Sequence, residues 1–368
     1  MEIAVLGGGH GCFAAAAEFS EQGHSVRWWR RESAAHSAVR DAGGVSLKDH
    51  RGKRQIGVAL LTDDLRLAVA GAELIVIPLP ATTHEALAPQ LAPVLEAGQV
   101  VFLPPGTFGS YIFAHALGTA QPGLDVSFAE TGTLPHLARK HGPAEVVVSA
   151  YATRLPTGVF PERNAAHAHA VLKRAYRSIE PCGNALSGAL MNAGPIIHPP
   201  LILMNAGPLE HFPAWDIHNE GTQPSIRRTT DALDQERIRV RQALGYPAPH
   251  FPLRDHYAKS GDEWMYGRAA HEKLTDSGDW REKIGLTSHR YMLEDVAIGL
   301  SFLTSVARWA DVSTPIGAGL LAIGSAIVER DLFVTGRTLE RLGLAQLSVS
   351  AMSRLLQDGF QTLGVEHG

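Results

Sequence analysis

A glycine-rich segment near the amino terminus has the residue types and spacing of a dinucleotide-binding turn. Gly7-Gly8-Gly9-His10-Gly11-Cys12 lies directly between a short apolar run, residues 3–6, and an alanine-rich stretch, residues 13–22. The pattern fits G-x-G-x-x-small, in which Gly7 permits a tight turn, Gly9 lets a pyrophosphate approach the backbone, and Cys12 serves as the small third residue. The pyrophosphate would bind the exposed N–H groups around His10 and Gly11, where the next helix starts. The alternative is a structural turn in an α/β protein that has lost its cofactor.

The end of the expected second strand decides which nicotinamide dinucleotide fits. An acidic residue about 20 positions after the glycines is typical of NAD enzymes, because it holds the ribose hydroxyls. This chain instead has Trp29-Arg30-Arg31-Glu32-Ser33. Guanidinium groups pair bidentately with phosphate oxygens, so Arg30 and Arg31, together with Ser33, favour the 2′-phosphate of NADP. A solvated pair of surface arginines is the alternative, and NAD remains open.

Two further turns follow expected strands at the edge where doubly wound sheets bind ligands. Pro104-Pro105-Gly106-Thr107 leaves a central strand, and Thr107 could approach the nicotinamide or the substrate. Pro80 lies in the corresponding turn one strand earlier, where its simplest role is to pack against the cofactor.

The second half contains a histidine and a charged helix start that could carry acid–base chemistry. His198 lies in an apolar, proline-broken stretch, residues 192–200, and histidine is the side chain that titrates near neutral pH. Because Pro199 disfavours an α conformation in the residue before it, we expect His198 at a helix break that opens to a cleft. Arg290 and Asp295 begin a long apolar helix, five residues apart, which is about 140° around a regular helix. They can face one pocket only if Arg290 precedes the first turn. A core histidine with satisfied hydrogen bonds is the alternative for His198.

The elements that must position these residues alternate between strand and helix in the first half of the chain. Strands are expected at residues 3–6, 25–29, 73–79, 99–103 and 125–128, a hairpin within 45–61, and another strand at 145–151, for which an antiparallel place at an edge is left open. This alternation predicts a Rossmann-type, doubly wound parallel sheet with helices on both faces. After about residue 185, helical stretches dominate, at 229–244, 290–308, 315–329 and 349–363. We therefore expect an α/β cofactor domain at 1–185 and a mostly α-helical substrate domain at 186–368.

Length and composition agree with two domains and exclude several classes of protein. The chain has 368 residues, of which 45% are hydrophobic and 19% charged, so it is not disordered. A net charge of −4 without a basic run argues against nucleic-acid binding. Two cysteines, Cys12 and Cys182, cannot form a disulfide framework. The amino terminus lacks a secretory signal and no segment is long and apolar enough to span a membrane, so we expect a cytoplasmic protein.

For several other polar and aromatic residues, the sequence favours structural or solvent-facing roles over catalytic ones. His211 and His218 flank Trp215-Asp216, but their spacing fits no standard metal site, so we expect solvated or substrate-lining roles and no metal. Trp264 and Tyr266 could line an amino-acid pocket or pack in the core. The acidic and basic residues of the 229–244 helix are expected on its solvated face: Asp231, Asp234, Glu236, Arg237, Arg239 and Arg241.

Taken together, these segments resemble the opine dehydrogenases, the octopine/nopaline dehydrogenase family, and most of all the bacterial N-(1-carboxyethyl)amino-acid dehydrogenases. The shared marks run in the family's order over nearly the whole chain: the glycine turn, residues 104–107, Glu130-Thr131, Asn192 through Pro199, residues 290–295, and residues 336–344. This spread makes the resemblance far more specific than any one motif.

The resemblance implies an oxidoreductase that acts on CH–NH groups. Such enzymes condense the amino group of an amino acid with a 2-oxo acid, typically pyruvate, and reduce the imine with NADH or NADPH to a secondary amine dicarboxylate. His198 matches the catalytic histidine and Asp295 the acid paired with it, an arrangement in which a carboxylate fixes the imidazole tautomer. Arg290 matches the arginine that binds the substrate carboxylate, and Glu130 falls where relatives hold the amino acid. Asn192 and Thr107 are expected beside the substrate.

The resemblance also implies a possible homodimer. In two places the sequence departs from the family's motifs. Arg30-Arg31 replaces the acid of close relatives that use NAD, and Cys12 replaces the third glycine. The first leaves the choice of cofactor open.

Two alternative functions remain open. The first is a 2-oxo acid or ketopantoate-type NADPH reductase without an amine partner, although such enzymes usually rely on a lysine at the cleft and none accompanies Asn192 or His198. The second is a non-catalytic protein that senses or binds NADP.

Overall fold

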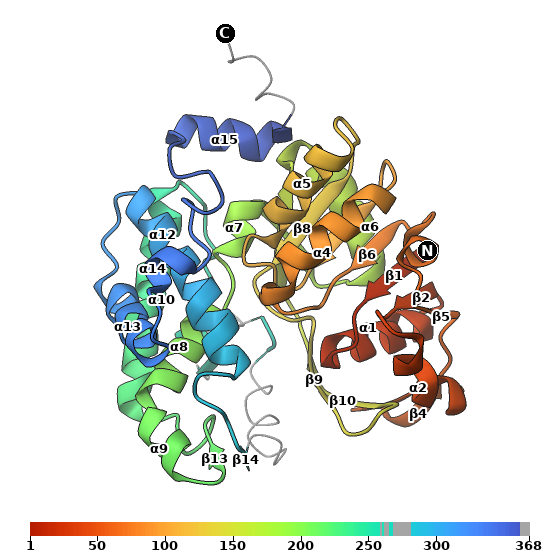
Figure 1. Cartoon of the computed structure of the whole chain (residues 1–368), viewed down its shortest axis with the longest axis horizontal. Coiled ribbons are helices and arrows are strands. Elements are labelled where there is room, and N and C mark those ends of the chain that lie inside the picture. The colour runs from red at the N-terminus through yellow and green to blue at the C-terminus, as the bar shows by residue number, and fades with distance from the viewer. Residues whose placement is uncertain (258–259, 261–264, 268–280, 361–368) are drawn as a thin grey trace. The chain divides into compact units, whose positions relative to one another are not determined.

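The computed structural model describes residues 1–257, 260, 265–267 and 281–360, and Trp264 therefore lies outside the described residues. The chain forms two compact units (Figure 1). The first comprises residues 1–79 and 83–189 and takes up the chain again from Arg354; the second comprises residues 80–82 and 190–353. These units differ from the expected domains, 1–185 and 186–368, because a short turn before α4 groups with the second unit and the carboxyl-terminal segment groups with the first.

The first unit is built on an eight-stranded sheet with the strand order β12-β11-β8-β7-β6-β1-β2-β5. The strands from β8 to β5 are parallel, in the order typical of a dinucleotide-binding sheet, which confirms the Rossmann-type prediction. The eight strands are β1 (Glu2–Leu6), β2 (Ser25–Trp29), β5 (Leu60–Thr62), β6 (Leu74–Val76), β7 (Val100–Leu103), β8 (Ser127–Thr131), β11 (Leu155–Phe160) and β12 (Ile179–Asn184).

The register of the parallel strands brings their carboxyl ends to one edge. Leu6 at the end of β1 pairs with Trp29 at the end of β2, and Leu103 at the end of β7 pairs with Glu130 in β8. The glycine turn, Arg30 and the 104–107 loop therefore leave the sheet at the same edge, which is the ligand-binding edge of this fold.

A second, four-stranded sheet in this unit was not predicted. Its order is β4-β3-β10-β9, with β3 (Val45–Asp49), β4 (Gly52–Ile56), β9 (His136–Lys140) and β10 (Glu145–Tyr151). The hairpin expected within residues 45–61 is present as β3 and β4. Residues 145–151, expected as a further strand of the main sheet, instead pair parallel to β3 and antiparallel to β9.

Helix α1 (His10–Glu21) contacts both sheets, β1 and β2 of the large one and all four strands of the small one. The run Cys12-Phe13-Ala14-Ala15-Ala16-Ala17 is buried along its whole length. A helix enclosed on both sides must be apolar and small all round, which explains the alanine run. The glycine turn that precedes α1 is thus attached to a firmly packed helix.

The other helices of the first unit are mostly short and connect the strands. They are η1 (Ser33–His36), α2 (Ser37–Asp41), α3 (Leu65–Val69), α4 (His84–Leu91), η3 (Ala92–Val94), α5 (Gly109–Ala120), η4 (Glu162–Asn164), α6 (Ala165–Ala175) and α7 (Ala185–Ala189). A turn of 3-10 helix, η2 (Ala81–Thr83), precedes α4.

The second unit is mostly helical, as predicted. Its elements are α8 (Gly194–Met204), α9 (Ala206–His211), α10 (Pro224–Ala243), η5 (Leu253–Tyr257), the π-helix η6 (Tyr291–Leu300), α12 (Ser301–Trp309), α13 (Pro315–Ile327), α14 (Leu332–Thr335) and the short ladder of β13 (Trp215–Asp216) with β14 (Arg281–Glu282). Helix α15 (Val349–Asp358) follows, and its residues are shared between the two units. Within the described residues, none of the helices is both long and apolar enough to cross a membrane.

The charged face predicted for α10 is wrong in part, because several of these side chains are buried. Asp234 and Arg237 form an ion pair at 2.7 Å, and Arg237 also donates to the carbonyl of His250 at 2.8 Å. Glu236 accepts hydrogen bonds from the backbone N–H groups of Ile316 and Gly317, at 2.9 and 2.8 Å, and so caps the start of α13. These charges hold the helices of the second unit together rather than facing solvent.

Candidate active site

The glycine turn is fixed by hydrogen bonds to β2. Gly7 has φ +118°, and a Cβ atom there would lie 2.3 Å from Leu79, so only glycine fits. The Gly7 N–H donates to the carbonyl of Trp29 at 2.9 Å, and the Trp28 indole donates to the carbonyl of Gly7 at 2.6 Å. The turn is therefore held in place at the end of β1.

The residues of this turn fit a dinucleotide. Gly9 caps α1, and a Cβ atom at Gly9 would meet nothing within 4 Å, so open space faces the first turn of the helix. A Cβ atom at Gly11 would lie 3.1 Å from Pro78, which leaves little room for a larger residue. Cys12 is buried, and burial raises the pKa of its thiol to about 12, so it packs as a small neutral residue. Open backbone N–H groups at a helix start suit a pyrophosphate.

The arginines after β2 differ in their surroundings. The Arg30 side chain folds back over the turn, where a Cβ atom at Gly8 would lie 2.7 Å from its Nε atom. Its Nη1 donates to the carbonyl of Ala35. Arg31 and Ser33 are exposed at the surface. The structure thus brings Arg30, but not the side chains of Arg31 and Ser33, against the glycine turn.

A further cation that the sequence did not reveal stands beside Arg30. Lys140, at the end of β9, places its Nζ atom 4.1 Å from the centre of the Phe13 ring, and the Arg30 guanidinium lies 5.9 Å from the same ring centre. The Lys140 backbone N–H donates to Nδ1 of His10 at 2.8 Å. His10 therefore links the start of α1 to the second sheet.

Glu130, at the end of β8, bonds to the loop that follows β7. Its side chain is fully buried, with Oε2 accepting from the N–H of Phe108 at 2.8 Å and Oε1 accepting from the Ser110 hydroxyl at 2.6 Å. Thr107 and Phe108 have φ of +49° and +63°, an uncommon conformation for residues with side chains. Glu130 thus holds the loop in place at Phe108 and Ser110, and its expected contact with the amino acid stays a prediction.

In the second unit, His198 and Asp295 form a close pair. Nδ1 of His198 lies 2.7 Å from Oδ2 of Asp295, and the two side chains are 14% and 8% exposed. The two residues come from α8 and η6, which pack tightly because glycines stand where they meet. A Cβ atom at Gly194 would lie 2.3 Å from Oδ1 of Asp295, and one at Gly299 would lie 2.2 Å from Pro195.

The backbone around His198 differs from the expectation of a helix break. Helix α8 runs from Gly194 to Met204 through His198, Pro199 and Pro200. The prolines remove two amide donors from the helix but do not end it, and close packing against η6 stabilises the segment. His198 therefore projects from a rigid helix rather than from a loop.

The π-helix explains how Arg290 and Asp295 share one region. Arg290 directly precedes η6 with helical backbone dihedrals, and the Leu293 N–H already donates to the carbonyl of His289, so Arg290 lies in the first turn and the condition deduced from the sequence is not met. The π-helix offers another route: its hydrogen bonds run from residue i to i+5, so residues five apart lie closer to one face than in an α-helix. Burial raises the pKa of Asp295 to about 7, and the charge of Arg290 opposes that rise. Arg290 itself keeps exposed surface.

An aromatic ring fixes the plane of the His198 imidazole. Tyr291 stacks on it with ring centres 3.8 Å apart and planes inclined by 10°. The Tyr291 hydroxyl lies 2.9 Å from Nε2 of His218. Tyr291 was not predicted as a site residue, and for His218 the sequence left a solvated and a substrate-lining role open. The position of Tyr291 next to the proposed substrate arginine could have suggested it, whereas the sequence offered no sign that His218 lies near His198.

Three polar residues near the pair bond to the backbone: Asn192 to the start of α8, and Glu294 and Arg337 to Ala81. Oδ1 of Asn192 accepts from the N–H of Gly194 at 3.0 Å, so Asn192 shapes the start of α8. Glu294 accepts from the N–H of Ala81 at 2.8 Å, and Arg337 donates to the Ala81 carbonyl at 2.9 Å. Pro80 precedes this anchored turn and is exposed. Burial, followed by the charge of Asp295, raises the pKa of Glu294 to about 7.

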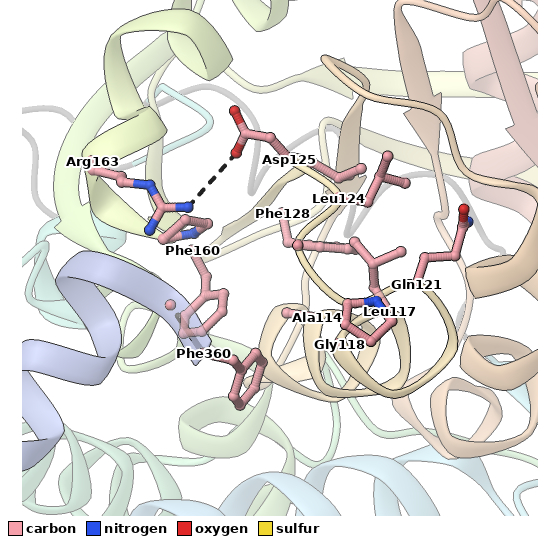
Figure 2. Close-up of a pocket in the computed structure, with 15 residues that line it drawn as sticks. Ala114, Leu117, Gly118, Gln121, Leu124, Asp125, Phe128, Phe160, Arg163 and Phe360 are labelled. Carbon is pink, nitrogen blue, oxygen red and sulfur yellow. Dashed lines mark ion pairs between the residues drawn. The ribbon is translucent and has the colours of Figure 1, made fainter. Parts of the chain in front are cut away.

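None of the predicted site residues lines the cavity shown in Figure 2. This cavity, of about 270 Å³, lies within the first unit between α5, the start of β8 and the Phe160–Pro161 corner. Figure 2 shows the Phe160 and Phe360 rings beside it and the ion pair of Arg163 with Asp125, at 3.7 Å. The start of β8 is at the opposite edge of the sheet from the glycine turn. Among the residues that the structure describes, no three His, Cys, Asp or Glu side chains gather as a metal site.

Both halves of the chain match families of known proteins. Residues 181–328 match the family described as NAD/NADP octopine/nopaline dehydrogenase, alpha-helical domain. Residues 2–103 match the amino-terminal part of NAD-dependent glycerol-3-phosphate dehydrogenase. A nicotinamide dinucleotide, NAD or NADP, is thus the cofactor of the proteins that share these domains.

Similar proteins extend over the whole chain. An opine dehydrogenase from Arthrobacter sp. (strain 1C) is 29% identical over 358 residues, which cover 95% of this chain and 97% of that protein. Octopine dehydrogenase, solved in complex with NADH and agmatine, has a TM-score of 0.71 at 17% identity, covering 96% of this chain and 97% of that one. A 2-dehydropantoate 2-reductase from Geobacter metallireducens shares the fold with a TM-score of 0.60 at 14% identity, covering 89% and 100%. The resemblance found in the sequence is therefore confirmed: residues 181–328 match the helical domain of the octopine/nopaline dehydrogenases, and nearly the whole chain is similar to an opine dehydrogenase.

Proposed function

We propose that this protein is an NADP-preferring opine dehydrogenase. It condenses the amino group of an amino acid with a 2-oxo acid, pyruvate being the first candidate, and reduces the imine to a secondary amine dicarboxylate. The observation that carries this proposal is the His198–Asp295 pair, 2.7 Å apart, in a helical domain of the octopine/nopaline type. The relative from Arthrobacter sp., which spans nearly the whole chain, is itself named an opine dehydrogenase.

The pair suits the proton transfers of the condensation. The substrate ammonium must lose a proton before its nitrogen adds to the carbonyl carbon, and the carbonyl oxygen must gain protons before it leaves as water and the C=N bond forms. His198 can take the first proton and return it to the departing oxygen. Asp295 orients the ring through Nδ1 and stabilises the imidazolium in between. The nicotinamide cofactor, when bound, supplies the hydride that reduces the imine carbon.

The other predicted residues take roles that agree with their positions. Arg290 is exposed at the start of η6 and available to a substrate carboxylate, which a guanidinium binds bidentately. Asn192 shapes the approach to His198, and Thr107 and Pro80 remain proposed contacts of the substrate and the cofactor. The homodimer that the resemblance implies stays a prediction, which light scattering would check.

The preference for NADP is proposed from the end of β2. No acid stands at residue 30, and the guanidinium of Arg30 covers the glycine turn. Gly7, Gly9, Gly11 and His10 would hold the pyrophosphate, and Arg30 the 2′-phosphate. Arg30→Asp should shift the preference toward NAD; unchanged affinities for NADPH and NADH would remove Arg30 from the site.

The function is tested by product formation. NADPH oxidation is followed with pyruvate plus each amino acid in turn, and the product is identified by mass. His198→Ala should lower kcat by about 10²–10⁴-fold because acid–base catalysis is lost, while the Kd for NADPH stays unchanged. His211→Ala, an exposed histidine of the same unit, is the matched control. Turnover of His198→Ala that equals the wild type would overturn the assignment.

The second candidate is a 2-oxo acid reductase of the ketopantoate type, favoured by the shared fold of the Geobacter metallireducens enzyme. Such an enzyme reduces the ketone directly and needs no amine. NADPH oxidation with a 2-oxo acid alone, at a rate that no amino acid increases, would select this function over the first.

A further inference from the structure

The amino-terminal unit places two cations side by side at the start of α1, and they come from different sheets. Arg30 follows β2 of the large sheet, and Lys140 ends β9 of the small sheet. Both approach the ring of Phe13, with Nζ of Lys140 at 4.1 Å and Cζ of Arg30 at 5.9 Å from its centre. Phe13 in turn packs edge-on against Trp28 of β2, with ring centres 4.6 Å apart.

Among the residues that the structure describes, neither cation is neutralised by an acidic side chain. Over the described part of the chain, no carboxylate forms an ion pair with Arg30 or Lys140, although both are partly buried. Burial lowers the pKa of Lys140, and the charge of Arg30 lowers it further. By contrast, Lys53 of the same small sheet pairs with Glu145 at 2.7 Å. Holding two positive charges close together costs free energy because they repel each other. Such a pair is expected where an anion binds and offsets the repulsion.

We propose that Lys140 and Arg30 form a two-cation site for a phosphoryl group of the dinucleotide, namely the 2′-phosphate of NADP(H). This proposal rests on the proposed use of a nicotinamide dinucleotide and adds Lys140 as a residue that determines cofactor specificity. A phosphate monoester carries close to two negative charges at neutral pH, which two cations match.

The position of Lys140 favours the 2′-phosphate over the pyrophosphate. The pyrophosphate is expected over the N–H groups that follow Gly9, where the backbone faces open space. Lys140 lies instead over Phe13, which packs toward β2, the strand whose end specifies the adenosine ribose. The Lys140 backbone bond to His10, 2.8 Å long, holds the end of β9 at this place.

The test measures binding without turnover. Isothermal titration calorimetry gives the Kd of 2′-phospho-ADP-ribose and of ADP-ribose for the wild-type protein, Lys140→Met and Lys140→Arg, at one ionic strength. Methionine keeps the apolar stem over Phe13 and removes the charge, so the Kd of 2′-phospho-ADP-ribose should rise about tenfold or more, as for the loss of one charge-assisted hydrogen bond. The Kd of ADP-ribose should stay within about twofold, which also shows that the site is folded. Arginine should restore most of the affinity for the phosphorylated ligand.

Lys53→Met is the matched control, because it removes a lysine charge from the same sheet without altering the site. Equal losses for the two ligands would overturn the proposal by assigning Lys140 to the pyrophosphate. Unchanged affinity for both ligands in Lys140→Met would overturn it by leaving Lys140 a packing role only. These results do not depend on opine synthesis: a protein that makes no opine can still show the Lys140 effect, and an active opine dehydrogenase can still lack it.

Discussion

The imidazole of His198 lies flat against the phenol ring of Tyr291, with ring centres 3.8 Å apart and planes inclined by 10°. This stack leaves the ring little freedom to turn, while Asp295 holds its Nδ1 edge. The other ring nitrogen is thereby kept in a fixed direction, which proton transfer to a substrate requires.

Tyr291 should act as a positioning residue. Tyr291→Leu removes the stacked ring, and we expect kcat to fall about three- to tenfold, in line with the energy of an aromatic pair, with KM and the Kd for NADPH little changed. Tyr291→Phe keeps the ring and loses only the hydroxyl beside His218, so it should retain most of the activity. Steady-state kinetics with separate kcat and KM values would check this. Equal loss in both variants would show that the hydroxyl, and not the stack, matters.

Asp295→Asn should separate geometry from charge. The amide can occupy the same space, but it cannot stabilise the imidazolium and can hold the ring in the wrong tautomer, so we expect kcat to fall about 10³–10⁴-fold. Fluorescence titration with NADPH should give an unchanged Kd. Asp311→Asn, an exposed acid of the same unit, serves as the control. A loss below tenfold in Asp295→Asn would remove the carboxylate from the mechanism.

Glu294 should make the protein less stable as the pH rises. Its pKa is about 7 in the folded protein against about 4.5 when unfolded, so between these values the folded state binds more protons. The free energy of unfolding therefore loses up to about 1.4 kcal/mol per pH unit from this group between about pH 4.5 and 7. Glu294→Gln keeps an acceptor for the N–H of Ala81 and removes the titration. Urea unfolding at pH 5, 6, 7 and 8 should show that the free energy of unfolding of the variant, relative to that of the wild type, rises with pH up to about pH 7. Above that pH the difference should stay constant. A constant difference would contradict the assignment.

Gly194 should tolerate no side chain. The Cβ atom of alanine would lie 2.3 Å from Oδ1 of Asp295, so Gly194→Ala must displace the carboxylate or the helix start. We expect a loss of about 1–3 kcal/mol in the free energy of unfolding and a lower kcat. Gly319→Ala, in α13 with nothing within 4 Å, should instead stabilise by up to about 1 kcal/mol. Thermal unfolding of both variants gives the comparison, and a Gly194→Ala protein as stable and active as the wild type would refute the close approach.

The sequence predicts the main sheet well because local patterns determine it. Strand, glycine turn and alanine-rich helix follow one another within the first 22 residues, and the same alternation recurs along the first half. The small sheet escapes prediction because β3 pairs with β10, about a hundred residues later. No local pattern specifies that partner, and each strand alone resembles one more strand of the large sheet.

The sequence predicts those residues of the candidate site whose type has a characteristic chemical role. His198, Asp295 and Arg290 follow from their chemistry and from the family's motifs, whereas the π-helix that carries Asp295 has no sequence signature. The support that Glu130 gives to the loop at Phe108 was not predicted, because a carboxylate that accepts hydrogen bonds from a loop and one that binds a ligand are the same residue type in the sequence. Lys140 was missed because its place beside Arg30 depends on the unpredicted small sheet.

The burial of Cys12 has a practical consequence for thiol chemistry. The chain has two cysteines, and Cys12 is enclosed between α1 and the sheet with a pKa raised to about 12, so its thiolate is scarce and out of reach of reagents. Cys182 is only half-buried. The native protein should therefore react with alkylating reagents at a single position, and modification of Cys12 would report the rate at which the cofactor-binding half of the molecule opens.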